Sequence, residues 1–348
     1  MERKITIQKV AELAGTSVST VSRVLSNPRY PVAEETRERV VKAVKNSGYK
    51  IGPGSRYSRK TSNQDIGVIL PNYSNPFYSL VLLGMEKEFQ NSGFNLLMYN
   101  SLRDSNYEYI LLKSLEQKGI ERVIISSVMQ DSGRLKRFTD RGMKLIFLDQ
   151  KVDNMENHIL FEYREGAYAA VKYLYDLGHR NFSLATTPLT RWSRKEILSG
   201  YQKALEDLSL RYSDEMLLLA KNDWEGEIEE ELSYDIKAGI MKARELLKRN
   251  SKTTAVLCVN DMVAFGLIQE LRNNQVMVPQ DVSVIGFDDI PFAAMFSPAL
   301  TTVRCPAIEI GQLAAQLLKQ QMNGSIGSGF DMKLAARLVE RKSTAKIN

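Results

Sequence analysis

One short stretch of the chain, TSVSTVSRVLSNP from Thr16 to Pro28, places small hydroxyl side chains around a single arginine. As a helix that begins after Ser17, it would bury only a narrow apolar stripe. The stripe consists of Val18, Val21, Val24 and Leu25. Hydroxyls bind phosphates, and the guanidinium of Arg23 can donate two hydrogen bonds to guanine. This exposed face is therefore typical of a helix that reads DNA.

Three helices are predicted before Gly48, and this stretch forms the second of them. Thr6 is a suitable N-cap for the first helix, which ends at Gly15, and Ser17 caps the second. The third helix runs through AEETRERVVKAVKNSG, with acids early and bases late, as the helix dipole favours. A helix, a tight turn at Gly15-Thr16 and a short helix have helix-turn-helix spacing. An ordinary helical bundle would not account for an arginine exposed between hydroxyls.

The basic charge of the chain is concentrated near its N-terminus. Residues 1–62 hold 13 Lys and Arg against 5 Asp and Glu, whereas the remaining 286 residues hold 34 against 36. A small basic head on a near-neutral body indicates a polyanion-binding module joined to a second unit. A solvated charged helix face would give the same asymmetry, so charge alone does not decide.

Length and composition indicate a globular protein with two or more domains. The chain has 348 residues, of which 43% are hydrophobic and 25% charged. The N-terminus MERKITIQKV lacks a hydrophobic signal core, and no apolar run has the length of a membrane span, so a cytoplasmic location is expected. Cys258 and Cys305 lie far apart, and neither His158 nor His179 is near a Cys or a second His. Neither a disulfide framework nor a metal or other cofactor is therefore expected.

From residue 65 onward, continuous apolar runs alternate with amphipathic stretches. The runs are IGVIL, FNLLMY, RVIISS, KLIFLD, FSLAT, TAVLCVN and VSVIGF. Continuous apolar strands that alternate with helices indicate parallel sheets covered on both faces. The runs are too many for one small sheet, so two doubly wound lobes are predicted.

Polar and aromatic side chains follow these strands at their carboxyl ends, where ligands bind in open α/β sheets. They are Asn75, Phe77, Tyr78, Asp149, Arg191, Ser193, Trp224, Asn260, Asp261, Asp288 and Asp289. Carboxylates and amides bind vicinal hydroxyls, and aromatic faces cover the C–H surface of a sugar. The set predicts a cleft that binds a small polar molecule, such as a sugar or a sugar derivative.

Members of this set also have structural interpretations. Asp261 is interpreted as a helix N-cap rather than a ligand, because Asn260-Asp261 opens a helix. Phe77 taken alone would be a core aromatic, and Asp149 and Asp288 are equally compatible with capping a loop. The joint pattern, rather than any single residue, favours a binding site.

The sequences ITIQKVAELAGTSVSTVSRVLSNP and VAEETRERVVKAVKNSGY closely resemble the head of the lactose/galactose repressor (LacI/GalR) family. The resemblance continues through the body to LVERKST near the C-terminus. It implies an all-α helix-turn-helix head and an α/β body of two periplasmic-binding-protein-like lobes. It also implies a homodimer that binds a pseudo-palindromic operator DNA through two heads, under the control of a small-molecule effector.

The expected boundaries follow from the same resemblance. The head spans 1–50, the hinge 51–64 and the body 65–348. The chain is expected to cross between the lobes near residues 160, 291–304 and 330. The lobes are then assigned as 65–160 with 304–330, and 161–291 with 331–343.

The resemblance also implies roles for individual residues. The base-reading positions of the recognition helix match Val18, Ser19 and Arg23. The phosphate-facing positions match Thr6, Ser17, Thr20, Ser22 and Asn27. The family's effector positions coincide with Phe77, Tyr78, Asp149, Arg191, Ser193, Trp224, Asn260 and Asp288.

The hinge departs from the family's pattern. The family has Pro-Asn-x-x-Ala-Arg-x-Leu, which becomes helical on DNA and inserts its Leu into the minor groove. Here the stretch reads IGPGSRYSRK, in which Arg56 keeps the DNA-binding Arg and Ser58 replaces the Leu. The segment Gly52-Pro53-Gly54 disfavours a helix. A flexible basic linker is predicted, with Tyr57 as a less favoured substitute for the wedge.

The cleft departs from the pattern as well. Ile197 stands where the family often has a ligand-binding Arg, and Glu162-Tyr163 replaces a frequent Asp-Asn pair. The hydrogen bonding of the ligand is therefore expected to differ from that of a plain hexose.

The leading hypothesis is a ligand-responsive, sequence-specific transcriptional regulator, a repressor of carbohydrate metabolism genes rather than an enzyme. The alternative is a sugar-binding enzyme or plain binding protein that carries a DNA-binding head, with Asp149 and Asp288 as the paired carboxylates of a hydrolase. The basic head disfavours the enzyme, which would not need it, and the sequence has no nucleophile elbow or phosphate loop. An architectural DNA-binding protein would leave the cleft unexplained.

Overall fold

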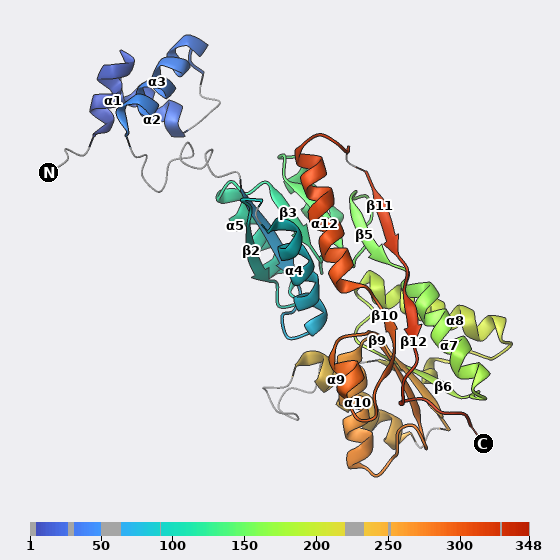
Figure 1. The fold of residues 1–348 in the computed structure, drawn as a ribbon. Coiled ribbons are helices and arrows are strands. Elements are labelled where there is room, and N and C mark those ends of the chain that lie inside the picture. Colours follow the sequence, from blue (N-terminus) through green and yellow to red (C-terminus); the bar gives the residue numbers. More distant parts are fainter. Residues whose placement is uncertain are drawn as a thin grey trace.

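The computed structural model describes residues 5–26, 31–49, 64–90, 92–219, 233–249, 252–327 and 329–347. The chain forms a small helical head and an α/β body of two lobes, which is the predicted fold class (Figure 1). None of the helices in the described ranges has both the length and the apolar character of a membrane-spanning segment.

The head consists of α1 (Ile7–Ala14), α2 (Val18–Ser26) and α3 (Glu34–Ser47). These helices enclose their own apolar core. It contains Val10, Ala11, Ala14, Val21, Val24, Leu25, Val40, Ala43 and Val44. The third helix begins with two acidic residues and ends at Gly48, whose φ of 69° is the left-handed conformation that glycine adopts easily.

The first lobe is built on a sheet with the strand order β11-β5-β4-β3-β1-β2, in which all pairs are parallel. Its strands are β1 (Asp65–Leu70), β2 (Asn95–Asn100), β3 (Arg122–Ile125), β4 (Lys144–Leu148), β5 (His158–Phe161) and β11 (Asp331–Leu334). Its helices are α4 (Pro76–Phe89), α5 (Ser105–Gln117), α6 (Ser132–Thr139) and α12 (Ala307–Met322). In β1, Val68 belongs to the apolar cluster that contains α4 and α12 residues, whereas Ile69 belongs to that of α5 and α6. The alternation places one helix pair on each face of the sheet.

The second lobe is built on a sheet with the order β12-β10-β9-β8-β6-β7. Its strands are β6 (Phe182–Thr186), β7 (Leu217–Leu219), β8 (Ala255–Cys258), β9 (Ser283–Asp288), β10 (Thr301–Arg304) and β12 (Arg337–Val339). Only the edge strand β12 is antiparallel to its neighbour among the described strands, an exception that the sequence did not predict. Its helices are α7 (Tyr163–Asp176), α8 (Trp192–Asp207), α9 (Tyr234–Lys248) and α10 (Asp261–Asn273), with the short α11 (Phe292–Met295) and a 3₁₀ turn at Asp214–Met216. The pair α7 and α8 covers one face, and α9 and α10 cover the other (Figure 1).

The chain passes between the lobes three times: after β5, between β10 and α12, and between β11 and β12. Residues 301–304 pair with β9 and therefore belong to the second lobe, although the expected boundary placed the crossing before residue 304. Residues 331–334 pair with β5 in the first lobe, although they were expected in the second. Strands of four residues carry too little periodicity to be assigned to a sheet from sequence alone.

Helices α4 and α12 meet backbone to backbone. A Cβ atom added at Gly84 would lie 2.1 Å from the carbonyl oxygen of Ile308, and one added at Gly311 would lie 2.0 Å from that of Val81. Glycines make the same close approach where α9 meets α10 in the second lobe. In each lobe, one pair of helices packs so closely that a side chain larger than glycine at these positions would clash with the facing backbone.

Candidate functional site

The turn between α1 and α2 has the predicted helix-turn-helix form. Gly15 adopts a φ of 59°, and the backbone N–H groups of Gly15 and Thr16 bond back to the carbonyl oxygens of Glu12 and Ala11. Ser17 caps α2, because its Oγ accepts a hydrogen bond of 3.0 Å from the backbone N–H of Thr20. The side chain of Thr6 stands at the N-cap of α1 but makes no capping hydrogen bond, in contrast to the prediction.

Helix α2 presents the hydroxyl and arginine face that the sequence suggested. Val21, Val24 and Leu25 are buried, whereas Val18 is 40% exposed, so its predicted place in the buried stripe is wrong. The position of Val18 lies instead on the outer face, which is where the family resemblance put a base-reading residue. The side chains that share this outer surface are Ser17, Val18, Ser19, Ser22 and Arg23, with Thr20 half-buried. Asn27 and Arg56 lie outside the described residues.

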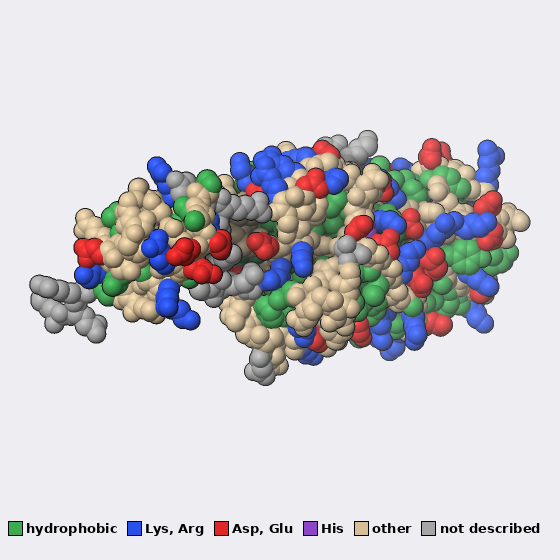
Figure 2. All heavy atoms as spheres, turned by 90° about the horizontal axis from the view of Figure 1, so that it is seen from above, with side chains coloured by type: hydrophobic (Ala, Val, Ile, Leu, Met, Phe, Trp, Pro, Cys, Tyr) green, Lys and Arg blue, Asp and Glu red, His purple; other side chains and the backbone are tan. Residues whose placement is uncertain are grey.

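The basic excess of the head is only partly within its helices. Of the 13 Lys and Arg in residues 1–62, seven lie outside the described residues, against one of the five acids. Figure 2 shows basic and acidic side chains on the same face of the head, and a further group of Lys and Arg on the body.

In the body, the guanidinium of Arg191 joins the two lobes. Arg191 precedes α8 of the second lobe, and its side chain crosses to the first lobe. Its Nη1 donates to the hydroxyl of Tyr78 at 2.9 Å, and its Nη2 donates to Ser126 Oγ at 2.9 Å and to Asp149 Oδ2 at 3.0 Å. Burial opposes the charge of this side chain, which is 7% exposed, but Tyr78 and Asp149 outweigh burial and raise the pKa of Arg191. The guanidinium therefore stays charged in the cleft.

Asp149 is the acceptor at the centre of this network. Its Oδ2 also accepts from the Tyr78 hydroxyl at 3.3 Å and from Gln150 Nε2 at 3.1 Å, and its Oδ1 accepts from the Tyr163 hydroxyl. Burial, and then the charge of Asp149, raises the pKa of Tyr163 far above its ordinary value, so this hydroxyl keeps its proton and donates. In this conformation Asp149 orients Arg191 and the two tyrosines, and both of its oxygens have partners.

Ser193 and Asp288 are buried residues of the second lobe, in α8 and at the end of β9. Ser193 is buried, and its Oγ accepts from Gln150 Nε2 at 2.9 Å. Asp288 ends β9 with a φ of 110°, an unusual conformation for a residue with a side chain. Burial, and then the charge of Asp261, raises the pKa of the buried Asp288 carboxyl well above its ordinary value.

Three of the predicted effector residues have structural roles in this conformation. Phe77 is a buried core aromatic that packs edge-on against Tyr78 and Phe161. Asn75 caps α4 by accepting from the backbone N–H of Phe77 at 3.0 Å. Asn260 caps α10 by accepting from Val263 N at 2.8 Å.

The prediction that Asp261 is the N-cap of α10 is therefore wrong by one residue. Asp261 is the first helical residue, and its carboxylate joins three segments of the second lobe. Its Oδ2 accepts from Ile290 N at 2.9 Å and its Oδ1 accepts from the Thr302 hydroxyl at 2.5 Å. A Cβ added at Gly286 would lie 2.2 Å from Asp261 Oδ1, so glycine is required there. Burial raises the pKa of Asp261 to about 7.

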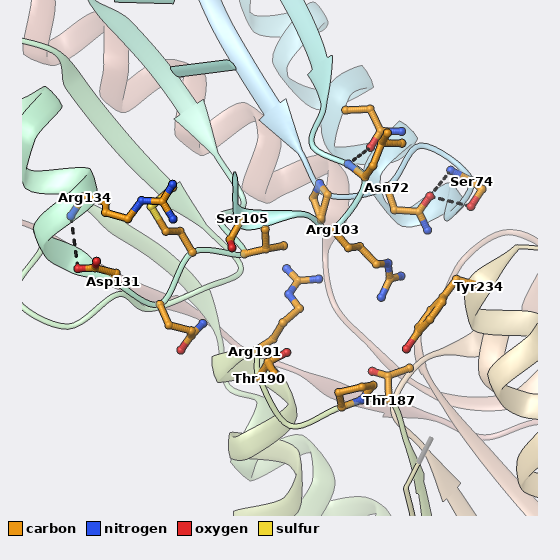
Figure 3. Close-up of a pocket in the computed structure, with 17 residues that line it drawn as sticks. Asn72, Ser74, Arg103, Ser105, Asp131, Arg134, Thr187, Thr190, Arg191 and Tyr234 are labelled. Carbon is orange, nitrogen blue, oxygen red and sulfur yellow. Dashed lines mark hydrogen bonds between the residues drawn. The ribbon is translucent and has the colours of Figure 1, made fainter. Parts of the chain in front are cut away.

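A cavity of about 900 Å³ opens between the lobes next to Arg191 (Figure 3). A second interlobe bridge stands at its edge: Arg103 Nη2 lies 2.7 Å from Asp235 Oδ2, and the Arg103 guanidinium lies 4.8 Å above the ring of Tyr234. Arg191 is the one predicted effector residue that lines this cavity within the described part of the chain. Tyr78, Asp149 and Ser193 form the network behind it, and Trp224 lies outside the described residues.

Sequence reasoning missed several residues of the cleft, among them Ser126 and Arg134. Gln150 and Arg103 follow predicted strands, so the rule that found Asp149 would also have found them. Tyr163 was noted only as a departure from the family pattern. Tyr234 and Asp235 open α9, and in the sequence they follow the acidic stretch EGEIEEELS rather than an apolar run that would signal a sheet edge.

Comparisons with known proteins cover both the head and the body. A family model for bacterial regulatory proteins of the lacI family matches residues 6–51, and one for a periplasmic binding protein-like domain matches residues 171–344. The HTH-type transcriptional repressor PurR of Vibrio campbellii is 29% identical over 348 residues, and the alignment covers 99% of each chain.

Two solved structures extend this likeness. A LacI family transcriptional regulator from Enterococcus faecium with bound ribose is 28% identical, with a TM-score of 0.71, over 82% of this chain and 100% of that one. A lac repressor dimer bound to operator and the anti-inducer ONPF shares the fold with a TM-score of 0.71 and 24% identity, over 99% and 100% of the two chains. With its helix-turn-helix head and its two-lobed body, the chain belongs to the LacI family of bacterial regulatory proteins.

Proposed function

We propose that the protein is a transcriptional repressor that binds operator DNA through its head and a small polar effector through its cleft, in the cytoplasm. One observation carries this proposal. The same chain contains a helix-turn-helix head, whose helix α2 exposes hydroxyls and an arginine, and a body whose two lobes are bridged by Arg191. The PurR relative, similar over the full length of the chain, is named as a transcriptional repressor.

The coupling between the two sites is proposed to run through the lobes. The head joins the first lobe at β1, and the bonds of Arg191 to Tyr78, Ser126 and Asp149 fix the second lobe against it. An effector that contacts Arg191 competes for or adds to these bonds and so changes how the lobes lie. Effector and operator then alter each other's affinity reciprocally.

We propose that the chain acts as a homodimer. Two strongly exposed apolar groups support this, since large apolar side chains exposed together mark protein interfaces. In the first lobe they are Met98 of the edge strand β2 and Ile110 of α5, and in the second Phe292 and Met295 of α11. Two heads on one dimer fit a pseudo-palindromic operator.

The effector is proposed to be a sugar or a sugar derivative, and the regulated genes those of carbohydrate metabolism. The ribose bound to the relative from Enterococcus faecium supports the ligand class. An enzyme is the second candidate from sequence, but the relatives in both comparisons are named as regulators. In addition, Asp149 has both oxygens engaged by protein donors, which does not suit a catalytic base.

Genomic footprinting of the purified protein identifies its operator, and titration with Arg23→Ala then tests the assigned role of α2. Loss of a bidentate base contact costs about 1–3 kcal/mol, so operator affinity should fall about 5- to 150-fold. Binding to random DNA should change much less. Lys42→Ala, which removes an exposed charge from α3, is the matched control. Equal losses of affinity for operator and for random DNA would mean that Arg23 contacts phosphate rather than a base. Failure of the protein to bind any genomic site would contradict the proposal that it is a repressor.

A further inference from the structure

The charged side chains that line the cleft cavity are almost all cationic. Arg103, Arg134 and Arg191 line it, and Asp131 is the one carboxylate among the described lining residues. Asp131 is already engaged, because its Oδ1 caps α6 by accepting from the backbone N–H of Gly133 at 2.9 Å and of Arg134 at 3.4 Å. The charged groups of the lining therefore offer a ligand mainly donors, whereas neutral side chains such as Asn100, Gln130 and Thr190 can both donate and accept.

The counterions of two of these arginines lie behind them. The side chains of Asp149 and Asp235 are 5% and 1% exposed, and neither residue lines the cavity. Arg191 and Arg103 each keep a buried Nε–H without a partner. A buried donor without an acceptor costs free energy, which a ligand oxygen would recover. Figure 3 shows both guanidiniums facing the same space between the lobes.

Arg134 is held in place without a carboxylate. Its Nη1 donates to Asn106 Oδ1 at 3.2 Å, and its guanidinium lies 4.6 Å from the centre of the Tyr109 ring. No ion pair involves Arg134 within the described residues. All of these contacts are inside the first lobe, so this arginine is prepositioned whichever way the lobes lie.

Four helices begin at the cavity. Ser105 of α5, Asp131 before α6, Arg191 before α8 and Tyr234 of α9 all line it. The N-terminal end of a helix carries a partial positive charge, which favours anions. At α5, α6 and α9, however, side chains already cap the first N–H groups: Asp104, Asp131 and Ser233 accept their hydrogen bonds. At α8 the N-cap residue Arg191 supplies no side-chain acceptor, although the backbone N–H groups of Arg194 and Lys195 bond to its carbonyl oxygen.

We propose that this cavity contains an oxyanion subsite formed by Arg103, Arg134 and Arg191, and that the effector carries a phosphoryl or carboxylate group bound there. The proposal deepens the proposed function and rests on it, since it names the chemical class of the molecule that controls the repressor. The neutral amides and hydroxyls of the lining can bind the hydroxyl groups of a sugar, but its three guanidiniums are matched best by an oxyanion, which accepts charge-assisted hydrogen bonds from each of them.

The test uses inorganic phosphate and acetate as probes of the subsite. Each is titrated into the full-length protein by calorimetry and by thermal unfolding, against sodium chloride at equal ionic strength. Phosphate, acetate or both should bind saturably and raise the unfolding temperature, because a ligand that binds only the folded state stabilises it. Which probe binds more tightly distinguishes a phosphoryl from a carboxylate group.

Arg134→Gln should weaken binding of that probe at least about tenfold, because one charge-assisted hydrogen bond is lost. Arg141→Gln is the matched control: it removes the same charge from an exposed residue just beyond α6, outside the cavity. Absence of saturable binding of both probes, or equal weakening by both variants, would overturn the subsite.

The same measurements separate this inference from the proposed function. If the protein binds its operator and responds to a neutral sugar while neither anion binds, the repressor stands and the oxyanion subsite is wrong. If no operator is found, the proposal that the protein is a repressor is wrong, but the anion titrations still test the oxyanion subsite independently.

Discussion

Arg191 shows how much of the cleft depends on a single side chain. Its guanidinium contacts three groups across the interlobe boundary, and Asp149 holds it by an ion pair that both partners bury. A buried ion pair gives little net stability, but removing one partner leaves an uncompensated charge. The network therefore acts mainly as a positioning device that is costly to disturb.

Asp149→Asn should lower the free energy of unfolding by about 3–5 kcal/mol, because the buried Arg191 charge loses its counterion. Urea unfolding measures the change. Asp140→Asn breaks the exposed ion pair with Lys136 and should have little effect. Similar small losses in both variants would mean that the charge of Arg191 is compensated elsewhere.

Asp261 makes stability depend on pH. Burial raises its pKa to about 7 in the folded protein, against an ordinary value of 3.8. The folded state then binds the proton more tightly than the unfolded state, so this contribution to stability is complete at acid pH and is lost as the pH rises through about 7. Between pH 5 and 6, the free energy of unfolding of the wild type relative to Asp261→Asn should fall by about 1.4 kcal/mol per pH unit. A difference that stays constant across this range would contradict the shifted pKa.

The sequence predicted the residues of the site as a group but did not show which individual residues would face the cleft. The rule that ligands lie beyond the carboxyl ends of strands placed Tyr78, Asp149 and Arg191 in one region, and the structure joins them by hydrogen bonds. It did not separate them from Phe77, which packs in the core, or Asn75, which caps a helix. That distinction depends on where each side chain points, which strand periodicity does not specify.

At the level of elements, the glycines of the helix pairs set how closely the helices approach. Gly84 and Gly311 allow α4 to touch α12, although the two helices lie more than 200 residues apart in the chain. Neither glycine has an unusual backbone angle, so neither gave a turn signal in the sequence. Their function becomes visible only when the two helices are side by side.

Gly311→Ala should therefore lower the free energy of unfolding by about 1–3 kcal/mol through overpacking against the Val81 carbonyl. Chemical denaturation followed by circular dichroism measures this loss. Gly327→Ala is the control, since an added Cβ there meets no atom within 4 Å. Equal stability of the two variants would show that α4 and α12 separate at little cost.

For the whole molecule, the alternation of apolar runs and amphipathic stretches predicted two doubly wound lobes, because buried parallel strands read as continuous apolar segments. The two later crossings were predicted a few residues too early, because β10 to β12 are short and β11 is largely exposed. The predicted hinge and Trp224 lie outside the described residues and remain predictions.

Asp235→Ala should open the cleft in the absence of effector, because it removes the interlobe bridge to Arg103. Small-angle X-ray scattering should then show a larger radius of gyration than for the wild type. Glu116→Gln, which breaks an ion pair within the first lobe, should leave the radius unchanged. An unchanged radius in Asp235→Ala would mean that the contacts of Arg191, Tyr163 and Gln150 across the boundary keep the lobes together without this bridge.

The three crossings between lobes also dictate when the protein can fold during synthesis on the ribosome. The first lobe needs α12 and β11, which come from the last 42 residues of the chain. Until they emerge, the apolar face that α4 presents to α12 has no cover, although 306 residues have already been made. The first lobe therefore cannot fold before the second lobe has been synthesised, although N-terminal units usually fold first. A nascent chain that stops at Arg304 leaves both lobes incomplete, because β12 of the second is missing as well. The body can complete its fold only after α12, β11 and β12 have been synthesised, whereas the head has its own core and can fold as soon as it emerges.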